Sequence, residues 1–452
     1  MSIYLAYVAF CAVAIAIFFL LEVRRAILVV FLGGWLLLPV TDYPLQAIQA
    51  RFPYWITGAA VPSDLLVTKA WIVSVVAFAG AALRDIPRLR AWHPRAIDAP
   101  IVLWCLWPLV SGLLAARPDP SPILASFYVV GCWGLPWLLG RIWFTGQDGR
   151  LSLIDGLAGA GLACLPFALL EGALPAWLYG LLYELHPFRN DGVDRYVGYR
   201  PLGFFEHGNQ YGIWVSLCAL AFLWRAASIG RFDQHRHLYM LGAAVSVAIA
   251  LAAQSVGAIL LLVAGLAVIA TWRFRALKAM AFTLAAMIAI VGAVHLSGIV
   301  PLKQIARETP MGRELLGAVR ATGRGSFAWR ISQDSKALSA VHASPLTGSA
   351  RWDWWRVSSG SRPWGLAMLL IGQYGLIGLA LAFGGLLAPV VRALSFRRAE
   401  NGWRADAVVL PLGVIVLLAL FDALLNSFFF FPAILAAGAI AVQDRQRATT
   451  RR

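Results

Sequence analysis

Four polar residues that could take part in chemistry stand close together just before an apolar run that begins near position 209. They are an arginine, a glutamate, a histidine and an asparagine: Arg200, Glu206, His207 and Asn209. The guanidinium group of arginine presents a planar fork of N–H donors that fits phosphate oxygens. Glu206 or His207 could accept a proton from a sugar hydroxyl. In the alternative interpretation this is an interfacial loop in which Asn209 caps the following helix, and the spacing alone leaves both open.

A second group of candidate residues lies between positions 330 and 364, in a stretch rich in arginine and tryptophan. The arginines could bind phosphate oxygens, and they are Arg330, Arg356 and Arg362. The tryptophans offer flat apolar rings that could stack on a sugar, and they are Trp352, Trp355 and Trp364. Tryptophan at a membrane boundary is also commonly an interfacial anchor, so this motif too has a structural interpretation.

Two shorter motifs interrupt apolar runs. Gln254 and Ser255 form either a tight turn or part of a cavity lining, because polar groups at membrane depth need partners or water. Gly372, Gly375 and Gly378 recur at a spacing of three in a later apolar run. Small residues at this spacing indicate close helix packing.

The elements that must position these residues are predicted to be membrane-spanning helices. Of the 452 residues 60% are hydrophobic and 13% are charged, whereas soluble domains carry about 25% charged residues. Several apolar runs approach or exceed the roughly 18 residues that indicate a membrane span. We therefore expect an all-α bundle of about 12–14 spans, near 3–21, 26–40, 64–83, 99–115, 123–140, 151–170, 209–224, 238–253, 255–271, 278–298, 364–391, 407–421 and 424–442.

Basic residues predict the orientation of this bundle. The formal net charge is +16, and more than half of the Lys and Arg residues follow alternate spans, all on the same side. Basic residues concentrate in cytoplasmic loops, so the C-terminus is expected in the cytoplasm and the N-terminus outside. This distribution explains the charge without nucleic acid as a partner. The expected divisions are N-terminal helices 1–170, a first periplasmic loop 171–208, central helices 209–298, a large and partly helical periplasmic loop 299–363, C-terminal helices 364–442 and a tail 443–452.

The large loop is cationic although it is expected outside. Residues 299–363 contain ten basic and four acidic residues, and such a surface suggests an anionic ligand. The five cysteines all lie in apolar runs, where we expect small core residues without disulfides. No metal-ligand spacing is present, and the first apolar run reads as an uncleaved span.

Three blocks of residues resemble the bacterial O-antigen ligase and polymerase superfamily, which also includes exopolysaccharide polymerases and some protein O-glycosylating ligases. The first block is Arg200-Pro-Leu-Gly-Phe-Phe followed by Asn209. The second contains Arg330 and, further on, the run Ser344-Pro-Leu-Thr-Gly. The third is the Gly-Leu-Ile-Gly run that begins at Gly375.

Three positions depart from the family pattern. Ligases of the family usually carry a histidine where this chain has Trp364, and a tryptophan is common where this chain has Asp334. A Ser-Arg pair common in the family is here Ser255-Val256. The missing histidine favours a polymerase or a divergent exopolysaccharide enzyme over a lipopolysaccharide ligase, with His207 as one candidate to take its place.

The resemblance implies metal-independent glycosyl transfer on the periplasmic side of the bacterial inner membrane, with no cofactor. The donor would be a glycan on undecaprenyl diphosphate, and the acceptor would be a hydroxyl of another glycan, often also lipid-linked. Because diphosphate is a good leaving group, the enzyme would mainly stabilise the charge that develops on it and align the acceptor.

The resemblance also suggests a role for each candidate residue. Arg200 and Arg330 would bind the diphosphate, and Glu206 or His207 would accept the proton. The expected substrate-binding residues are Asn209, Arg356, Arg362, Trp352, Trp355 and Trp364.

Other functions fit the same sequence. A ligase would move a finished glycan onto lipid A core or a protein in one transfer. A transporter of lipid-linked glycans would carry ionisable residues at mid-span, and these regions are nearly free of charge here. A non-catalytic partner in a cell-envelope complex is a further alternative. Expected partners are the lipid-linked donor, the glycan acceptor, membrane lipid and a possible chain-length regulator.

Overall fold

The computed structural model describes residues 3–40, 68–183, 196–230, 233–271, 308–321, 325–356, 363–395 and 408–442, with a few positions between 286 and 296. Within these ranges the protein is helical and contains no strand, and one isolated bridge pairs Asp119 with Arg351. The helices are α1 Ile3–Leu20, α2 Val23–Leu37, α4 Lys69–Arg84, α5 Ile86–Ala91, η2 Ala96–Asp98, α6 Ala99–Leu114, α7 Pro122–Val129, η3 Val130–Gly134, α8 Leu135–Trp143, α9 Gly146–Leu162, α10 Leu165–Leu170, α11 Trp177–Leu182, α12 Gly208–Ser228, α13 Arg236–Ala252, α14 Val256–Thr271, α17 Pro310–Ala321, α18 Gly325–Ala343, η5 Trp354–Arg356, α19 Leu366–Ser395, α20 Val409–Leu425 and α21 Pro432–Ile440.

The prediction of an all-α membrane protein is confirmed in its coarse form. In the described part of the chain five helical stretches are long and apolar enough to cross a membrane: Ala96–Leu114, Pro122–Trp143, Gly146–Leu170, Gly208–Ser228 and Leu366–Ala393. Shorter apolar helices accompany them. The count of about 13 spans stays a prediction, and the expected span at 278–298 falls largely outside the described residues.

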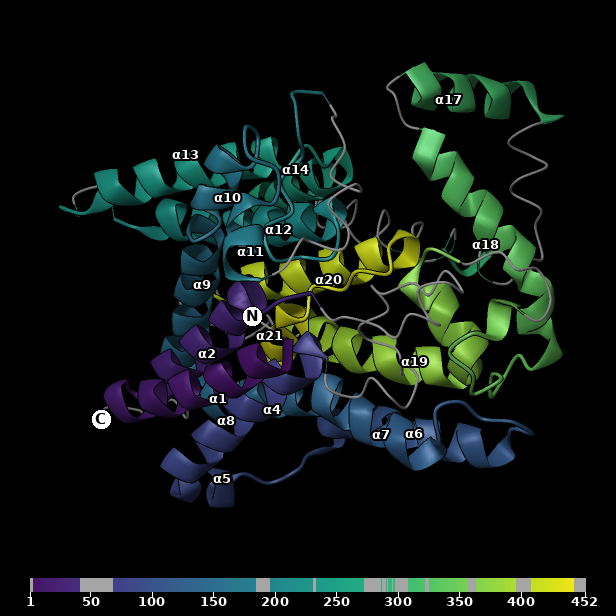
Figure 1. Ribbon diagram of the computed structural model, residues 1–452, viewed down its shortest axis with the longest axis horizontal. Coiled ribbons are helices and arrows are strands. Elements are labelled where there is room, and N and C mark those ends of the chain that lie inside the picture. Colours follow the sequence, from purple (N-terminus) through teal and green to yellow (C-terminus); the bar gives the residue numbers. More distant parts are fainter. Residues whose placement is uncertain are drawn as a thin grey trace, which may run out of the picture.

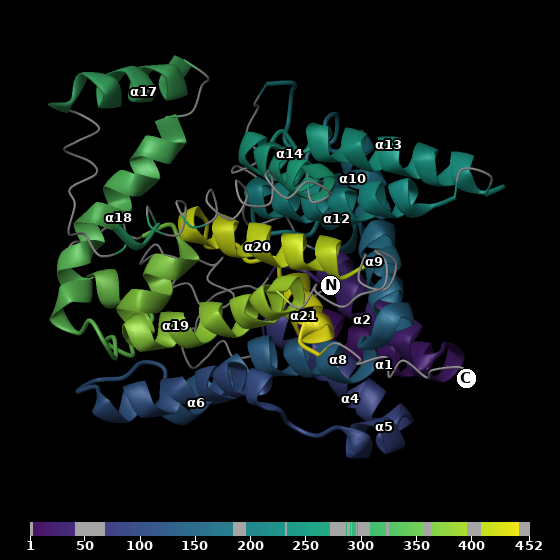
Figure 2. The ribbon, with the colours of Figure 1, turned by 180° about the vertical axis from the view of Figure 1, so that it is seen from behind.

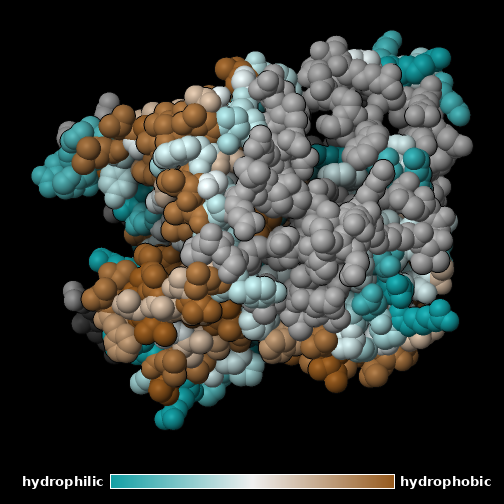
Figure 3. Space-filling model, viewed as in Figure 1, coloured by the Kyte–Doolittle hydropathy of each residue, from teal (hydrophilic) through white to brown (hydrophobic). Residues whose placement is uncertain are grey.

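On the face shown in Figure 3, apolar residues cover much of the surface that the described residues form. On α1, Phe19 is 71% exposed and Leu20 is 81% exposed, and on α6 Leu113 is 74% exposed. A soluble protein rarely exposes such broad apolar patches. In a bilayer these side chains would contact lipid tails.

Several helices begin where the sequence supplies a cap. The side-chain oxygen of Thr68 accepts a hydrogen bond from the main-chain N–H of Trp71 at 3.4 Å and starts α4. Ser121 does the same for the N–H of Leu124 at 3.4 Å, and Pro122 follows in the first turn of α7. Both arrangements satisfy N–H groups that a helix leaves unpaired at its start.

The centre of the bundle is formed by α20 and α21 (Figures 1 and 2). They contact α12, α14 and α19, and α21 packs along α8. The contact between α8 and α21 is close at the backbone: a Cβ atom on Gly140 would lie 2.1 Å from the carbonyl oxygen of Leu435. A Cβ atom on Gly438 would lie 2.3 Å from the carbonyl oxygen of Trp137. Glycine is therefore required at both positions.

The predicted last span, at 424–442, is wrong as a continuous helix. The helix α20 ends at Leu425, residues 426–431 are not helical, and α21 covers only nine residues. Pro432 stands in the first turn of α21, where its missing N–H breaks no helical hydrogen bond. The sequence reads as one apolar run because the non-helical segment contains four consecutive phenylalanines.

The glycine motif in α19 packs against both a loop and a helix. Gly375 lies against the backbone of Leu346, whereas Gly378 lies against Trp107 of α6, so the expected close helix packing is confirmed at Gly378. Gly375 has a positive φ of 71° and kinks α19. The N–H of Leu376 donates to the carbonyl oxygen of Pro345 at 2.8 Å. The second and third blocks therefore form one structural unit, in which the loop after α18 closes the interrupted turn of α19.

Replacing Gly375 with alanine is expected to destabilise the protein by roughly 2 kcal/mol or more, since both backbone strain and a steric clash oppose the change. A Cβ atom there would lie 2.1 Å from the carbonyl oxygen of Leu346. Thermal unfolding of the purified protein in detergent measures this effect. Gly384→Ala in the same helix is the matched control, because its Cβ would meet nothing within 4 Å. Equal melting temperatures for the two variants would contradict the prediction.

Candidate functional site

The structure brings the first group of candidate residues together at the start of α12. The Arg200 side chain is buried, with 1% of the residue exposed. Its Nη2 donates to the Oδ1 of Asn209 at 2.5 Å, and its Nε donates to the carbonyl oxygen of Ala253 at 3.2 Å. The guanidinium group is thus held in one orientation by a side chain of α12 and by the end of α13.

Asn209 does not cap α12, so the alternative interpretation of this residue is wrong. The cap is His207, whose Nδ1 accepts from the N–H of Asn209 at 2.9 Å. Because Nδ1 accepts, a neutral His207 ring carries its proton on Nε2. The ring stacks on Phe428, with centroids 5.0 Å apart and planes 15° from parallel. His207 is therefore placed as a hydrogen-bond donor.

Glu206 is the best-placed proton acceptor of the group. The residue is 1% exposed, and neither carboxylate oxygen has a hydrogen-bond partner among the described residues. Its main-chain N–H donates to the Oε1 of Gln210 at 2.9 Å, which fixes the backbone. Burial raises the pKa of the Glu206 carboxyl group, and the positive charge of Lys69 acts in the opposite direction. A buried carboxyl group with free acceptor positions is suited to take a proton from a bound hydroxyl.

Lys69 is a residue of this site that the sequence prediction missed. It is fully buried, and its Nζ donates to the carbonyl oxygen of Phe204 at 2.6 Å. The ammonium group lies 5.5 Å from the ring centroid of Trp35 and 5.2 Å from that of Phe205. The available signal was a lone lysine at the start of an apolar stretch, since a membrane-buried ionisable residue points to function.

Arg330 lies in a second polar group, at the end of α20. Its Nη1 donates to the Oδ1 of Asn426 and, at 3.4 Å, to the carbonyl oxygen of Leu425. The Nδ2 of Asn426 donates in turn to the Oδ1 of Asp422 at 2.6 Å. Asp422 and Asn426 were also missed, although they form a polar pair four residues apart in an otherwise apolar run.

The segment 426–431 connects the two groups. Arg330 binds its first residue, Asn426, and His207 stacks on Phe428. Phe431 stacks on Trp35 with centroids 5.0 Å apart, close to Lys69. Residues far apart in the sequence therefore converge on one non-helical segment between α20 and α21.

The described tryptophans of the large loop do not present open faces. Trp352 and Trp355 are buried, and their rings meet edge to face at 6.2 Å. The Nε1 of Trp352 donates to the Oδ2 of Asp119 at 2.9 Å. A sugar platform at these rings stays a prediction that requires the cluster to open. The side chain of Arg356 and the whole of Arg362 lie outside the described residues.

Two of the positions that depart from the family pattern contact each other. The main-chain N–H of Trp364 donates to the Oδ1 of the buried Asp334 at 2.9 Å. Asp334 therefore fixes the entry to α19, and the Trp364 ring stays a candidate for substrate contact.

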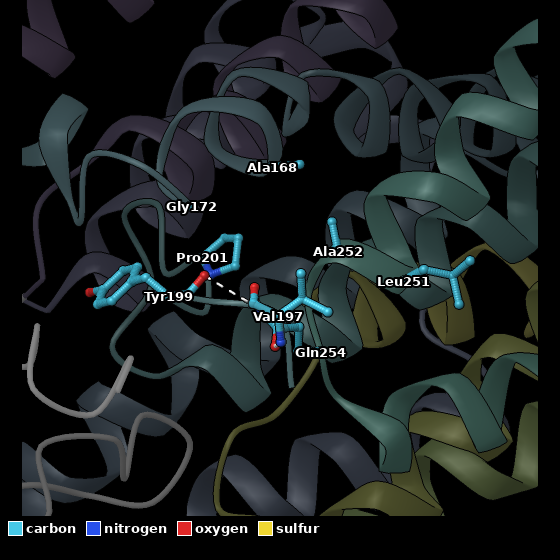
Figure 4. Close-up of a pocket in the computed structure, with 8 residues that line it drawn as sticks. All are labelled: Ala168, Gly172, Val197, Tyr199, Pro201, Leu251, Ala252 and Gln254. Atoms are coloured by element: carbon cyan, nitrogen blue, oxygen red, sulfur yellow. Dashed lines mark hydrogen bonds between the residues drawn. The ribbon is translucent and has the colours of Figure 1, made fainter. Parts of the chain in front are cut away.

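Gln254 combines the two roles that the sequence left open. It lies in the turn between α13 and α14 with a positive φ of 48°. Its Oε1 accepts from the N–H groups of Tyr196 and Val197 at 2.9 and 3.0 Å, and its Nε2 donates to the carbonyl oxygen of Val197 at 3.0 Å. Gln254 also lines a pocket of about 360 Å³ together with Tyr199 and Leu251 (Figure 4). This side chain thus holds the segment that leads to Arg200.

Among the residues that the structure describes, no three His, Cys, Asp or Glu side chains are grouped so that they could hold a metal ion. The groups available for chemistry in this region are guanidinium, ammonium, imidazole and carboxyl groups. Comparison with protein-family models and with curated proteins found no match for this chain.

Proposed function

We propose that this protein is a membrane glycosyltransferase that polymerises glycan repeat units carried on undecaprenyl diphosphate. The observation that carries the proposal is the buried group at the start of α12. There Arg200 is held by Asn209 and the main chain, and Glu206 lies buried with free carboxylate oxygens beside Lys69. The group combines a fixed phosphate-binding cation with a proton acceptor.

In the proposed reaction the acceptor hydroxyl oxygen forms a bond to the anomeric carbon of the donor glycan. The bond from that carbon to the diphosphate oxygen breaks. The diphosphate, which stays attached to its lipid, leaves with the bonding electron pair. The hydroxyl proton passes to Glu206. Arg200 and Arg330 stabilise the negative charge on the leaving diphosphate, and a fixed guanidinium group needs little reorganisation to do so.

The proposal places this site on the periplasmic side of the bacterial inner membrane, with segments 171–208 and 299–363 on that side. The distribution of basic residues supports this orientation, because α4 runs from Lys69 at the site to an arginine-rich segment at its other end. The donor's isoprenoid tail would stay in the bilayer while its diphosphate reaches Arg200.

The proposal is tested by turnover of the purified protein with lipid-linked repeat units, read on a gel after metal chelation. A ladder of products is the expected result. Transfer that appears only when core lipid or protein is added would replace the polymerase with a ligase. No transfer under either condition, with uptake of the lipid-linked glycan into vesicles, would replace it with a transporter.

A further inference from the structure

A second pocket lies at the opposite end of α4 from Lys69. The helix rises about 1.5 Å per residue, so its two ends are separated by roughly 22 Å. The pocket has a volume of about 230 Å³ and is lined by residues of α5, α8 and the connections that follow them. Those with polar groups are Arg88, Trp92, His93, Arg95, Arg141 and Thr145.

The acidic residues next to this pocket are already engaged. Asp98 accepts from Arg141 through both carboxylate oxygens, at 2.7 and 3.0 Å, and from the N–H of Arg95 at 2.8 Å. Asp85 accepts from the Nε1 of Trp143 at 3.1 Å. The charges of Asp85 and Glu22 act on Arg88 from a distance, but neither Arg88 nor Arg95 forms an ion pair within the described part of the chain.

The pocket offers donors without matching acceptors. Arg88 donates through Nε to the carbonyl oxygen of Ile142 at 2.8 Å, which orients its guanidinium group. Burial and then the charge of nearby Arg24 lower the pKa of Arg88, while the charges of Asp85 and Glu22 act in the opposite direction. A bound anion would relieve the repulsion between the two arginines.

Two exposed apolar residues closely precede Arg88 in the chain. Leu83, in the last turn of α4, is 77% exposed, and Ile86, at the start of α5, is 42% exposed. A phosphate group bound by Arg88 would therefore lie within a few residues of side chains that suit acyl chains. This combination of cations and exposed apolar residues favours a lipid headgroup over a free anion.

We propose that the pocket formed by Arg88, Trp92 and Arg95 binds the phosphate group of an anionic phospholipid. The site lies away from Arg200 and Glu206 and does not depend on the function proposed for them.

Native mass spectrometry of the full-length protein in detergent, titrated with phosphatidylglycerol, tests the proposal. We expect saturable binding that weakens about fivefold for each pocket arginine removed, in Arg95→Gln and in Arg88→Gln. Arg90→Gln is the matched control, because Arg90 is exposed on α5 and does not line the pocket.

Three results would overturn the proposal. The first is equal binding of phosphatidylglycerol by Arg88→Gln, Arg95→Gln and the Arg90→Gln control. The second is equal binding of phosphatidylcholine, which would show a general lipid contact. The third is full competition by inorganic phosphate at the same concentration, which would assign the pocket to the free ion.

Discussion

Replacing Arg200 with lysine is expected to lower the rate of glycosyl transfer about 100-fold or more, because the site loses a preorganised charge-stabilising donor. An ammonium group cannot reproduce the planar fork with which Arg200 reaches Asn209 and the carbonyl oxygen of Ala253. The measurement is the initial rate of product formation from lipid-linked repeat units. Thermal unfolding of the same preparation separates a catalytic effect from a loss of fold.

A second variant tests the position of the guanidinium group without removing it. Arg200 packs on Gly208, where a Cβ atom would lie 2.3 Å from the arginine Nε. Gly208→Ala should therefore displace Arg200 and, like Arg200→Lys, lower the rate of glycosyl transfer. Arg225→Lys is the matched control, because that arginine pairs with Asp155 at an exposed position. Transfer at the wild-type rate in a folded Arg200→Lys protein would remove Arg200 from the mechanism.

Replacing Glu206 with glutamine is expected to lower turnover by about 100- to 10,000-fold, the range that general base catalysis contributes. Stability should be unchanged or higher, since the variant removes a buried carboxylate that has no hydrogen bond among the described residues. A loss of turnover together with retained stability is the signature of a catalytic group. Wild-type turnover in this variant would show that another residue acts as the general base.

The pH dependence of turnover and stability follows from the raised pKa of Glu206. The base must be ionised, so turnover should fall with decreasing pH at a higher pH than for an ordinary glutamate. Because the pKa is higher in the folded than in the unfolded protein, ionisation destabilises the fold as the pH rises through this range. The stability advantage of Glu206→Gln should therefore grow from acidic to neutral pH.

Glu171 provides a matched comparison for Glu206. It is equally buried, but its Oε2 accepts from the N–H groups of Leu202 and Gly203 at 2.7 and 3.0 Å. Glu171→Gln should lower the melting temperature, because it weakens two charge-assisted bonds to the loop before α12. Opposite effects of the two substitutions on stability would separate the structural carboxylate from the catalytic one.

The sequence predicted the helices well and the contacts between them poorly. Apolar runs locate most helices because burial in lipid selects them strongly, and the grouping of Arg200, Glu206 and His207 follows from their closeness in the chain. Lys69 was missed because it meets Phe204 across 135 positions. Its partner could not be inferred from a local pattern.

The role of segment 426–431 could not be predicted from the sequence, for a different reason. Hydropathy does not distinguish a non-helical run of phenylalanines from a membrane helix, so the sequence predicted Asn426 and Phe428 as parts of a span. The burial of Trp352 and Trp355 was also hidden, because their packing depends on Asp119 in a distant loop.

The short helix α21 has a consequence for how the protein is made in the membrane. A helix of nine residues is about 13 Å long, whereas the hydrocarbon layer is about 30 Å thick. The non-helical backbone before it is tolerated at membrane depth only where protein surrounds it. This segment and α21 therefore cannot enter the bilayer as an independent span. We expect them to insert by docking Gly438 against α8, which precedes them in the chain.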